Sequence, residues 1–326
     1  AKRRREAALL DQETREFCRQ ARRTGNILGW ALTLLTVMTL ALSFFLGLLA
    51  VAGPGLGRAG EALSAVIRSD WFSSGGASLA GYAVAALPVF AVLSRVPLPR
   101  QEQKRMRVRK FLLFFIVIEG GGTAFNLLGN AINLFVAGLT GRLSWGMNPV
   151  HEILSSYNWM MVLYVALLGP VIEEFIFRGQ ILRRLRPFGD WAAIAYSSLM
   201  FGLMHGNITQ FLYATYIGTV LGYVAVRTGR LRYCMLLHIL VNSCSVALSF
   251  LSQGSSLLVT ALLVSAVLAM YLMIAASAAI LCVAARRIYL ERGGMPDGCS
   301  GGRGLSALLA GAGTLVFTAI CLGVMG

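Results

Sequence analysis

Long apolar segments alternate with short polar segments along most of this chain. Nine apolar segments lie near the ~20 residues that a membrane-spanning helix requires, at 27–52, 77–95, 111–139, 157–182, 190–206, 208–226, 232–251, 256–285 and 304–325. The fifth and sixth are short and meet at Gly206-Asn207, so they can form a hairpin that does not fully cross. The pattern predicts an all-α fold, a polytopic transmembrane bundle of about 8–9 helices.

Composition supports this interpretation. Of the 326 residues, 57% are hydrophobic and 13% are charged, whereas soluble domains usually carry about 25% charged residues. We expect a basic cytoplasmic segment at 1–26 and a single transmembrane domain at 27–326. The tripeptide 50–52, Ala-Val-Ala, resembles a signal-peptidase site. The apolar run before it exceeds the roughly 7–15 residues of a signal peptide, so we expect an uncleaved first span.

The basic residues indicate an orientation. The net charge is +15, and 25 of the 29 Lys and Arg residues fall on one side of the predicted spans, in the amino-terminal tail and in alternate loops. Because cytoplasmic loops are rich in Lys and Arg, we expect the amino terminus in the cytoplasm and the carboxyl terminus outside. This distribution at helix ends argues against a nucleic-acid partner. The Gly-, Ala- and Arg-rich composition favours a bacterial cytoplasmic membrane.

Two further features concern the polar regions. Segment 1–26 places Leu9, Leu10 and Phe17 among arginines, which predicts a helix lying on an anionic lipid surface; a solvated basic tail is the alternative. The six cysteines include no CxxC pair and no metal-ligand spacing. We expect reduced, structural thiols, since free Cys in apolar runs behaves as a small hydrophobe.

The fourth apolar segment carries an acid pair and an arginine. Charged side chains at bilayer depth cost about 2.5–3.5 kcal/mol each on insertion scales, so Glu173, Glu174 and Arg178 need a shared reason to be there. Pro170 has no N–H to donate, which should loosen the helix just before the pair. Glu174 and Arg178 are four residues apart and can form an ion pair. Glu173 then lies on another face, free to act as a general base on water.

Polar residues recur in the fifth and seventh segments. Phe201 and His205 are four apart, so the aromatic ring can wall the imidazole, which can assist the base or protonate a leaving amine. His238 and Asn242 are also four apart and can both donate to the oxyanion of a tetrahedral intermediate. Taken singly, each residue has a simpler explanation as an interhelical hydrogen bond. The catalytic hypothesis depends on their coincidence within three helices.

The third segment has a polar face of its own. Its members, which share one helical face, are Glu119, Asn126, Asn130 and Asn133, next to three glycines at 120–122. We favour an interhelical hydrogen-bond stripe with close helix approach; a polar wall of a substrate cavity is the alternative. His151 and Glu152 are expected in an external loop, without an assigned role.

The motifs EExxxR, FxxxH and HxxxN, in this order, resemble the CAAX protease and bacteriocin-processing family (CPBP, also called ABI) of intramembrane glutamic endopeptidases, related to CAAX prenyl protease 2. The resemblance covers about residues 155–250. It implies that Glu173 activates water together with His205, and that His238 and Asn242 form the oxyanion hole. Glu174, Arg178 and Phe201 would support them. It implies no cofactor; a Glu–His–His zinc site is the alternative, although the sequence has no HExxH.

These observations lead to the hypothesis of an intramembrane endopeptidase. Its partner would be a membrane-embedded or lipid-anchored substrate: a CAAX-like tail, a bacteriocin or pheromone precursor, or a membrane protein. The alternatives are a non-catalytic scaffold or immunity protein of the same family, and a transporter whose buried Glu and His carry protons. The sequence leaves the substrate and the oligomeric state open.

The depths of the candidate residues pose a difficulty. At 1.5 Å per residue, the distance from the expected cytoplasmic end of its helix is roughly 15 Å for Glu173 (from Arg183), roughly 9 Å for His238 (from Arg232) and roughly 22 Å for His205 (from Asp190). These groups can meet if the fifth segment begins well below the membrane surface, or if its hairpin is re-entrant. We predict one of these arrangements, with the site toward the cytoplasmic half of the bilayer.

Overall fold

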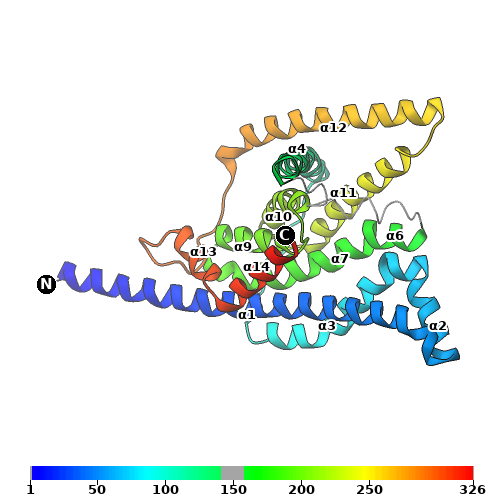
Figure 1. Ribbon diagram of the computed structural model, residues 1–326. Coiled ribbons are helices and arrows are strands. Elements are labelled where there is room, and N and C mark those ends of the chain that lie inside the picture. The colour runs from blue at the N-terminus through cyan, green and yellow to red at the C-terminus, as the bar shows by residue number, and fades with distance from the viewer. Residues whose placement is uncertain (1, 141–157, 326) are drawn as a thin grey trace.

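A computed structural model describes residues 2–140 and 158–325, and every regular element in these ranges is helical (Figure 1). The helices are α1 (Lys2–Ala52), α2 (Arg58–Arg68), α3 (Ala77–Leu93), α4 (Val108–Thr140), α6 (Trp159–Leu163), α7 (Gly169–Glu174), α8 (Arg183–Leu185), α9 (Asp190–Leu203), α10 (Ile208–Thr228), α11 (Leu231–Leu251), α12 (Leu257–Ala284), α13 (Gly301–Leu309) and α14 (Ala312–Met325). The predicted all-α fold is confirmed. The expectations for His151 and Glu152 fall outside the described residues.

Fewer helices meet the criteria for a membrane span than the nine segments suggested. Six are long and apolar enough in the described ranges, namely Arg5–Leu56, Phe72–Leu93, Val108–Leu139, Trp159–Phe188, Leu231–Leu251 and Leu257–Arg287. A seventh arises if α13 and α14, which meet at 72°, form one broken span. The protein is therefore an integral, multi-pass membrane protein.

Helices α9 and α10, the predicted hairpin, are not among these spans. Helix α9 has 14 residues and thus a length of roughly 21 Å, less than the hydrocarbon core of about 30 Å. Helix α10 has 21 residues but includes Thr, Gln and Tyr side chains along its length. Their membrane depth stays a prediction.

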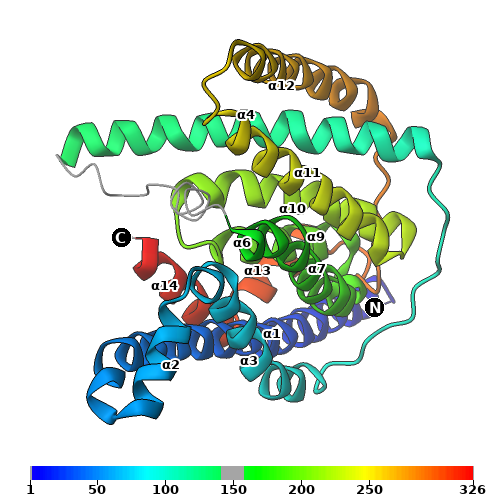
Figure 2. The ribbon, with the colours of Figure 1, turned by 90° about the vertical axis from the view of Figure 1, so that its right-hand side faces the viewer.

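The helices form a layered bundle. Helix α12 packs on α4, α4 on α10, and α10 on α9, while α1 contacts α3 on one side and α13 and α14 on another (Figures 1 and 2). Helices α7 and α11 cross the middle of the bundle and contact each other. The amino-terminal part of α1 extends beyond the other helices (Figure 1), with Leu9 and Leu10 exposed.

Glycines allow α1 to approach the carboxyl-terminal helices closely. A Cβ atom at Gly29 would lie 2.0 Å from the backbone nitrogen of Thr314, and one at Gly25 would lie 2.1 Å from the carbonyl oxygen of Leu308. The side chain of Asn26 accepts a hydrogen bond of 2.8 Å from the N–H of Gly313. The last apolar segment was expected as one helix, whereas a bend divides it into α13 and α14.

We predict that Gly29→Ala lowers the midpoint of thermal unfolding in detergent, because overpacking a tight contact costs about 1–3 kcal/mol. Gly47→Ala on the same helix is the matched control, since nothing lies within 4 Å of a Cβ there. The control should be neutral or stabilising, because Ala favours a helix over Gly by about 0.5–1 kcal/mol. Equal midpoints for the two variants would contradict the close α1–α14 packing.

Candidate active site

The acid pair lies on a rod, residues 159–188, whose backbone alternates between α-helical and wider π-helical turns. The π turns are Tyr164–Leu168 and Phe175–Leu182, and they flank α7, which ends at Glu174. In the first π turn, the N–H of Gly169 donates to the carbonyl of Tyr164, five residues back. The expected loosening of the helix at Pro170 is thus observed as a π turn. Such turns occur frequently at functional sites.

Asn242 has a structural partner in this turn. In the π register, the residue at 170 would donate its N–H to the carbonyl of Val165, but proline has none. Asn242 Nδ2 on α11 donates to that carbonyl at 2.9 Å and so supplies the missing bond. The sequence analysis treated Asn242 as a free oxyanion donor, whereas one of its two amide hydrogens is already used. The second is available, and Asn242 lines a cavity described below.

A buried ion cluster joins the rod to α11. Glu174 Oε1 lies 2.7 Å from Arg178 Nη1 and 3.0 Å from His238 Nδ1. The side chains of Glu174 and Arg178 are 0% exposed. The guanidinium carbon of Arg178 lies 4.6 Å from the ring centroid of Phe201, a cation–π contact that strengthens when water is excluded. The predicted Glu174–Arg178 pair is therefore confirmed.

Glu173 faces away from this cluster and keeps 17% of its side chain exposed. Its Oε2 lies 3.8 Å from His238 Nε2, too far for a direct hydrogen bond but close enough for both atoms to contact one bound water. The two neighbouring carboxylates thus occupy different environments. Glu174 is fully buried and paired with a cation, whereas Glu173 borders open space.

Phe201 lies beside both imidazoles. Its ring centroid is 4.9 Å from that of His205 and 5.9 Å from that of His238, with interplanar angles of 89° and 90°. The expectation that Phe201 walls His205 is confirmed. The edge-to-face arrangement fixes the two rings relative to one aromatic plane, so α9 and α11 bring their histidines to the same side of α7.

Hydrogen bonds define the proton positions on the two rings. His205 Nδ1 lies 2.9 Å from the carbonyl oxygen of Phe201. Since a carbonyl only accepts, Nδ1 carries the proton, and Nε2 of the neutral ring is an acceptor. His238 Nδ1 likewise donates to Glu174, so its Nε2 can donate only when the ring is an imidazolium.

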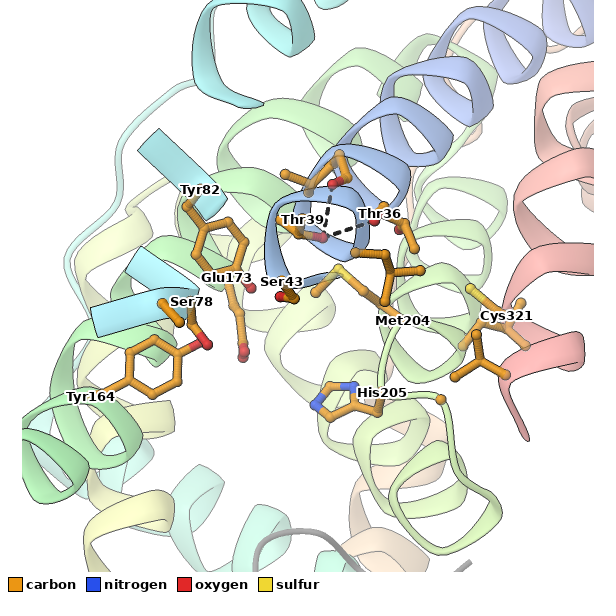
Figure 3. Close-up of a pocket in the computed structure, with 16 residues that line it drawn as sticks. Thr36, Thr39, Ser43, Ser78, Tyr82, Tyr164, Glu173, Met204, His205 and Cys321 are labelled. Atoms are coloured by element: carbon orange, nitrogen blue, oxygen red, sulfur yellow. Dashed lines mark hydrogen bonds between the residues drawn. The ribbon is translucent and has the colours of Figure 1, made fainter. Parts of the chain in front are cut away.

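Two cavities meet at Glu173. One, of about 330 Å³, lies between α1, α3, α14 and the rod; the other, of about 470 Å³, lies between α4, α10, α11 and the rod. Both are lined by Tyr164, Glu173 and His205. Figure 3 shows the smaller cavity, with Glu173 and His205 on opposite sides of it. Glu173 and His205 therefore lie at the boundary between two cavities.

The structure adds hydroxyl groups that the sequence analysis missed. Tyr82 and Ser78 on α3 line the smaller cavity beside Glu173, together with Tyr164 (Figure 3). In the sequence these residues look like ordinary packing groups of apolar segments. The one available signal was that Tyr164 belongs to the same segment as Glu173.

The donor set was also considered as a metal site. No group of three or more His, Cys, Asp and Glu side chains suited to a metal ion occurs in the described ranges. Glu173 Oε2 and His238 Nε2 lie 3.8 Å apart. The described residues therefore do not bring together the three ligands that the Glu–His–His zinc alternative needs.

Comparison with known proteins gives two matches. Residues 155–244 match the family model described as "Type II CAAX prenyl endopeptidase Rce1-like". The chain is also 27% identical over 131 residues to "Putative membrane peptidase YdiL" of Bacillus subtilis (strain 168). That alignment covers 40% of this chain and 51% of the relative, so the chain spans about half of that protein's length. No solved structure shows significant similarity.

The helical architecture defines a multi-pass membrane protein. Its segment 155–244, which carries the acid pair and both histidines, is similar to the type II CAAX prenyl endopeptidase family. The matched segment contains the rod, α9, α10 and most of α11. It contains none of α1, α3, α4 and α14, which complete the two cavities.

We predict that Arg178→Ala lowers the free energy of unfolding by about 3–5 kcal/mol, because it leaves the buried Glu174 carboxylate without its cation. The measurement is denaturant unfolding in detergent. Arg15→Ala is the matched control, since Arg15 pairs with Asp11 on an exposed surface where such pairs contribute about 0–1 kcal/mol. The double variant Glu174→Gln/Arg178→Met should recover part of the lost stability. Equal free energies of unfolding for Arg178→Ala and Arg15→Ala would contradict the role of the buried pair.

Proposed function

We propose that this protein is an intramembrane endopeptidase that hydrolyses a peptide bond of a membrane-embedded or lipid-anchored substrate. The observation that carries the proposal is the position of Glu173: a partly exposed carboxylate at the boundary of two cavities, within 3.8 Å of His238 and opposite His205. General base catalysis needs a carboxylate with access to water beside a group that binds the reacting carbonyl.

The reaction begins at Glu173. The carboxylate takes a proton from a water molecule, and the hydroxide oxygen bonds to the scissile carbonyl carbon. The neutral His205 presents Nε2 as a second acceptor toward the same water, because Nδ1 is bonded to Phe201. Glu173 then passes this proton to the amide nitrogen as the C–N bond breaks, which gives a carboxylic acid and an amine.

The tetrahedral intermediate carries an oxyanion that needs hydrogen-bond donors. His238 supplies Nε2–H when its ring carries both protons, while Nδ1 stays bonded to Glu174. Asn242 supplies its second amide hydrogen while the first stays on Val165. Arg178 and Phe201 act through other residues. The guanidinium compensates the charge of the Glu174 carboxylate, and the aromatic ring fixes the positions of both imidazoles.

The proposed substrate class follows from the surroundings of the site. The larger cavity has a volume of about 470 Å³, within the roughly 300–1,000 Å³ of known ligand sites. The distribution of basic residues supports a cytoplasmic amino terminus in a bacterial membrane, and the basic amino-terminal part of α1 supports contact with anionic lipid. A CAAX-like tail, a peptide precursor and a membrane protein all fit this class.

We predict that Glu173→Gln lowers the rate of peptide cleavage in liposomes by about 10²–10⁴-fold, the usual contribution of a general base. His205→Ala and His238→Ala should each remove most activity as well. The measurement is mass spectrometry of membrane peptides with and without the substitution. Glu61→Gln, the same change at an exposed position on α2, should leave cleavage unchanged.

Other outcomes identify other functions. A phenotype that survives Glu173→Gln in a folded protein would indicate a scaffold or immunity role. Proton-coupled flux in liposomes without cleavage would indicate a transporter.

Metal removal tests the mechanism separately. We predict that cleavage persists after prolonged incubation with a chelator, because the described residues offer no three-ligand metal group and Glu173 can activate water directly. The measurement is the cleavage rate before and after chelation, with a zinc-dependent peptidase as a positive control for the treatment. Complete loss that added zinc restores would overturn the glutamic mechanism.

A further inference from the structure

The polar face of α4 divides into two parts with different surroundings. Asn130 and Asn133 contact Thr209 on α10 by side-chain hydrogen bonds, and Gly129 approaches the backbone of the same residue. That part is an interhelical contact, as the sequence analysis favoured. Glu119 and Asn126 instead line the larger cavity. For them, the alternative of a cavity wall describes the structure better.

Glu119 is buried, and one oxygen of its carboxyl group has no partner among the described residues. Glu119 is only 5% exposed, and its Oε2 atom has no hydrogen-bond partner among the described residues. The hydroxyl of Thr123 donates to the backbone carbonyl of Glu119 rather than to its side chain. An unpaired ionisable group at membrane depth is costly, and such groups mark binding or transport sites. The interhelical hydrogen bonding that explains Asn130 therefore does not explain the buried carboxyl group of Glu119.

The cavity has a shape suited to an extended peptide. Its lining follows one face of α11 from His238 through Asn242 to Ser252, a length of roughly 21 Å at 1.5 Å per residue. An extended chain of about six residues covers that distance at ~3.3 Å each. Glu119 lies on the opposite helix, α4, so a peptide held beside Glu173 passes it.

Among the described residues, the lining of this cavity offers Glu119 no Lys or Arg partner. Its lining includes the carboxylates of Glu119 and Glu173 and the imidazoles of His205 and His238, with no Lys or Arg among the described residues that form it. His205 and His238 serve the reaction in the proposed mechanism, which leaves Glu119 without a function. A cationic group of the substrate would supply the partner that the protein itself does not provide.

We propose that Glu119 is a specificity-determining residue that binds a cationic nitrogen group of the peptide substrate. This inference rests on the proposed endopeptidase function. The group is an ammonium or guanidinium, and it comes either from a Lys or Arg side chain near the scissile bond or from the amino terminus of a short peptide. Both donate charge-assisted hydrogen bonds to a carboxylate, and an apolar environment strengthens them.

The test uses the full-length protein in liposomes and a set of acyl-anchored peptides that differ at one position. In each peptide one position carries Lys, the neutral acetyl-lysine or Glu, and this position is moved along the peptide from one set to the next. Every peptide is made with a free and with an acetylated amino terminus. We expect a preference in kcat/KM of about tenfold or more for Lys over acetyl-lysine at one position, the effect of one hydrogen bond to a charged group. Glu119→Gln should abolish that preference while leaving cleavage of the acetyl-lysine peptide nearly unchanged.

Matched controls isolate the carboxylate. Glu102→Gln makes the same change in an exposed loop and should retain the preference. If the preference disappears on acetylation of the amino terminus rather than of the lysine, the terminus is the bound group. The absence of any charge preference in the unsubstituted protein, or its persistence in Glu119→Gln, would overturn the assignment.

A binding measurement separates this inference from the proposed function. Fluorescence anisotropy of the Lys and acetyl-lysine peptides is recorded with Glu173→Gln protein and with Glu173→Gln/Glu119→Gln protein. We expect about tenfold tighter binding of the Lys peptide in the first and equal binding in the second. Tighter binding of the Lys peptide without any cleavage by the unsubstituted protein would refute the endopeptidase function but support the Glu119 site. Cleavage without a preference that depends on Glu119 would support the endopeptidase function but refute the Glu119 site.

Discussion

The contact between Glu174, Arg178 and His238 is the constraint on which the site depends. Two ionised side chains with 0% exposure can remain charged only if each compensates the other and further donors satisfy them. His238 provides one such donor from another helix, and the ring of Phe201 provides a face for the guanidinium. Because four groups from the rod, α9 and α11 share this cluster, it fixes the relative positions of those helices. Glu173, its immediate neighbour, is thereby held at the cavity.

The backbone beside this cluster lacks one N–H donor, because residue 170 is a proline. Pro170 leaves the Val165 carbonyl without its intrahelical donor, and Asn242 supplies the bond from α11. The wider π turns on both sides of α7 set the directions in which consecutive side chains point. One carboxylate of the acid pair therefore turns into the protein and the other toward open space. A local defect in the rod and a distant amide together define the geometry of the site.

The sequence predicted features that depend on local spacing and missed features that depend on helix packing. The i,i+4 pair of Glu174 and Arg178 and the contact of Phe201 with His205 follow from helical periodicity alone, and both are confirmed. The bond from Asn242 to Val165 joins residues 77 positions apart, which no periodicity encodes. The 72° bend between α13 and α14 arises where glycines meet α1, a long-range contact. Tyr82 was missed because an aromatic residue in an apolar segment normally serves packing.

The boundary position of Glu173 has a consequence for how the two cavities can change shape. The acid pair, both imidazoles and the ion cluster all lie in the segment 155–244 that matches the family model. Much of the remaining wall of each cavity comes from flanking helices, with α1, α3 and α14 on one side and α4 on the other. Substitutions in those flanking helices would reshape the cavities without altering the cluster. The form of the space and the polar groups at its boundary can therefore vary independently, because they lie on separate parts of the polypeptide.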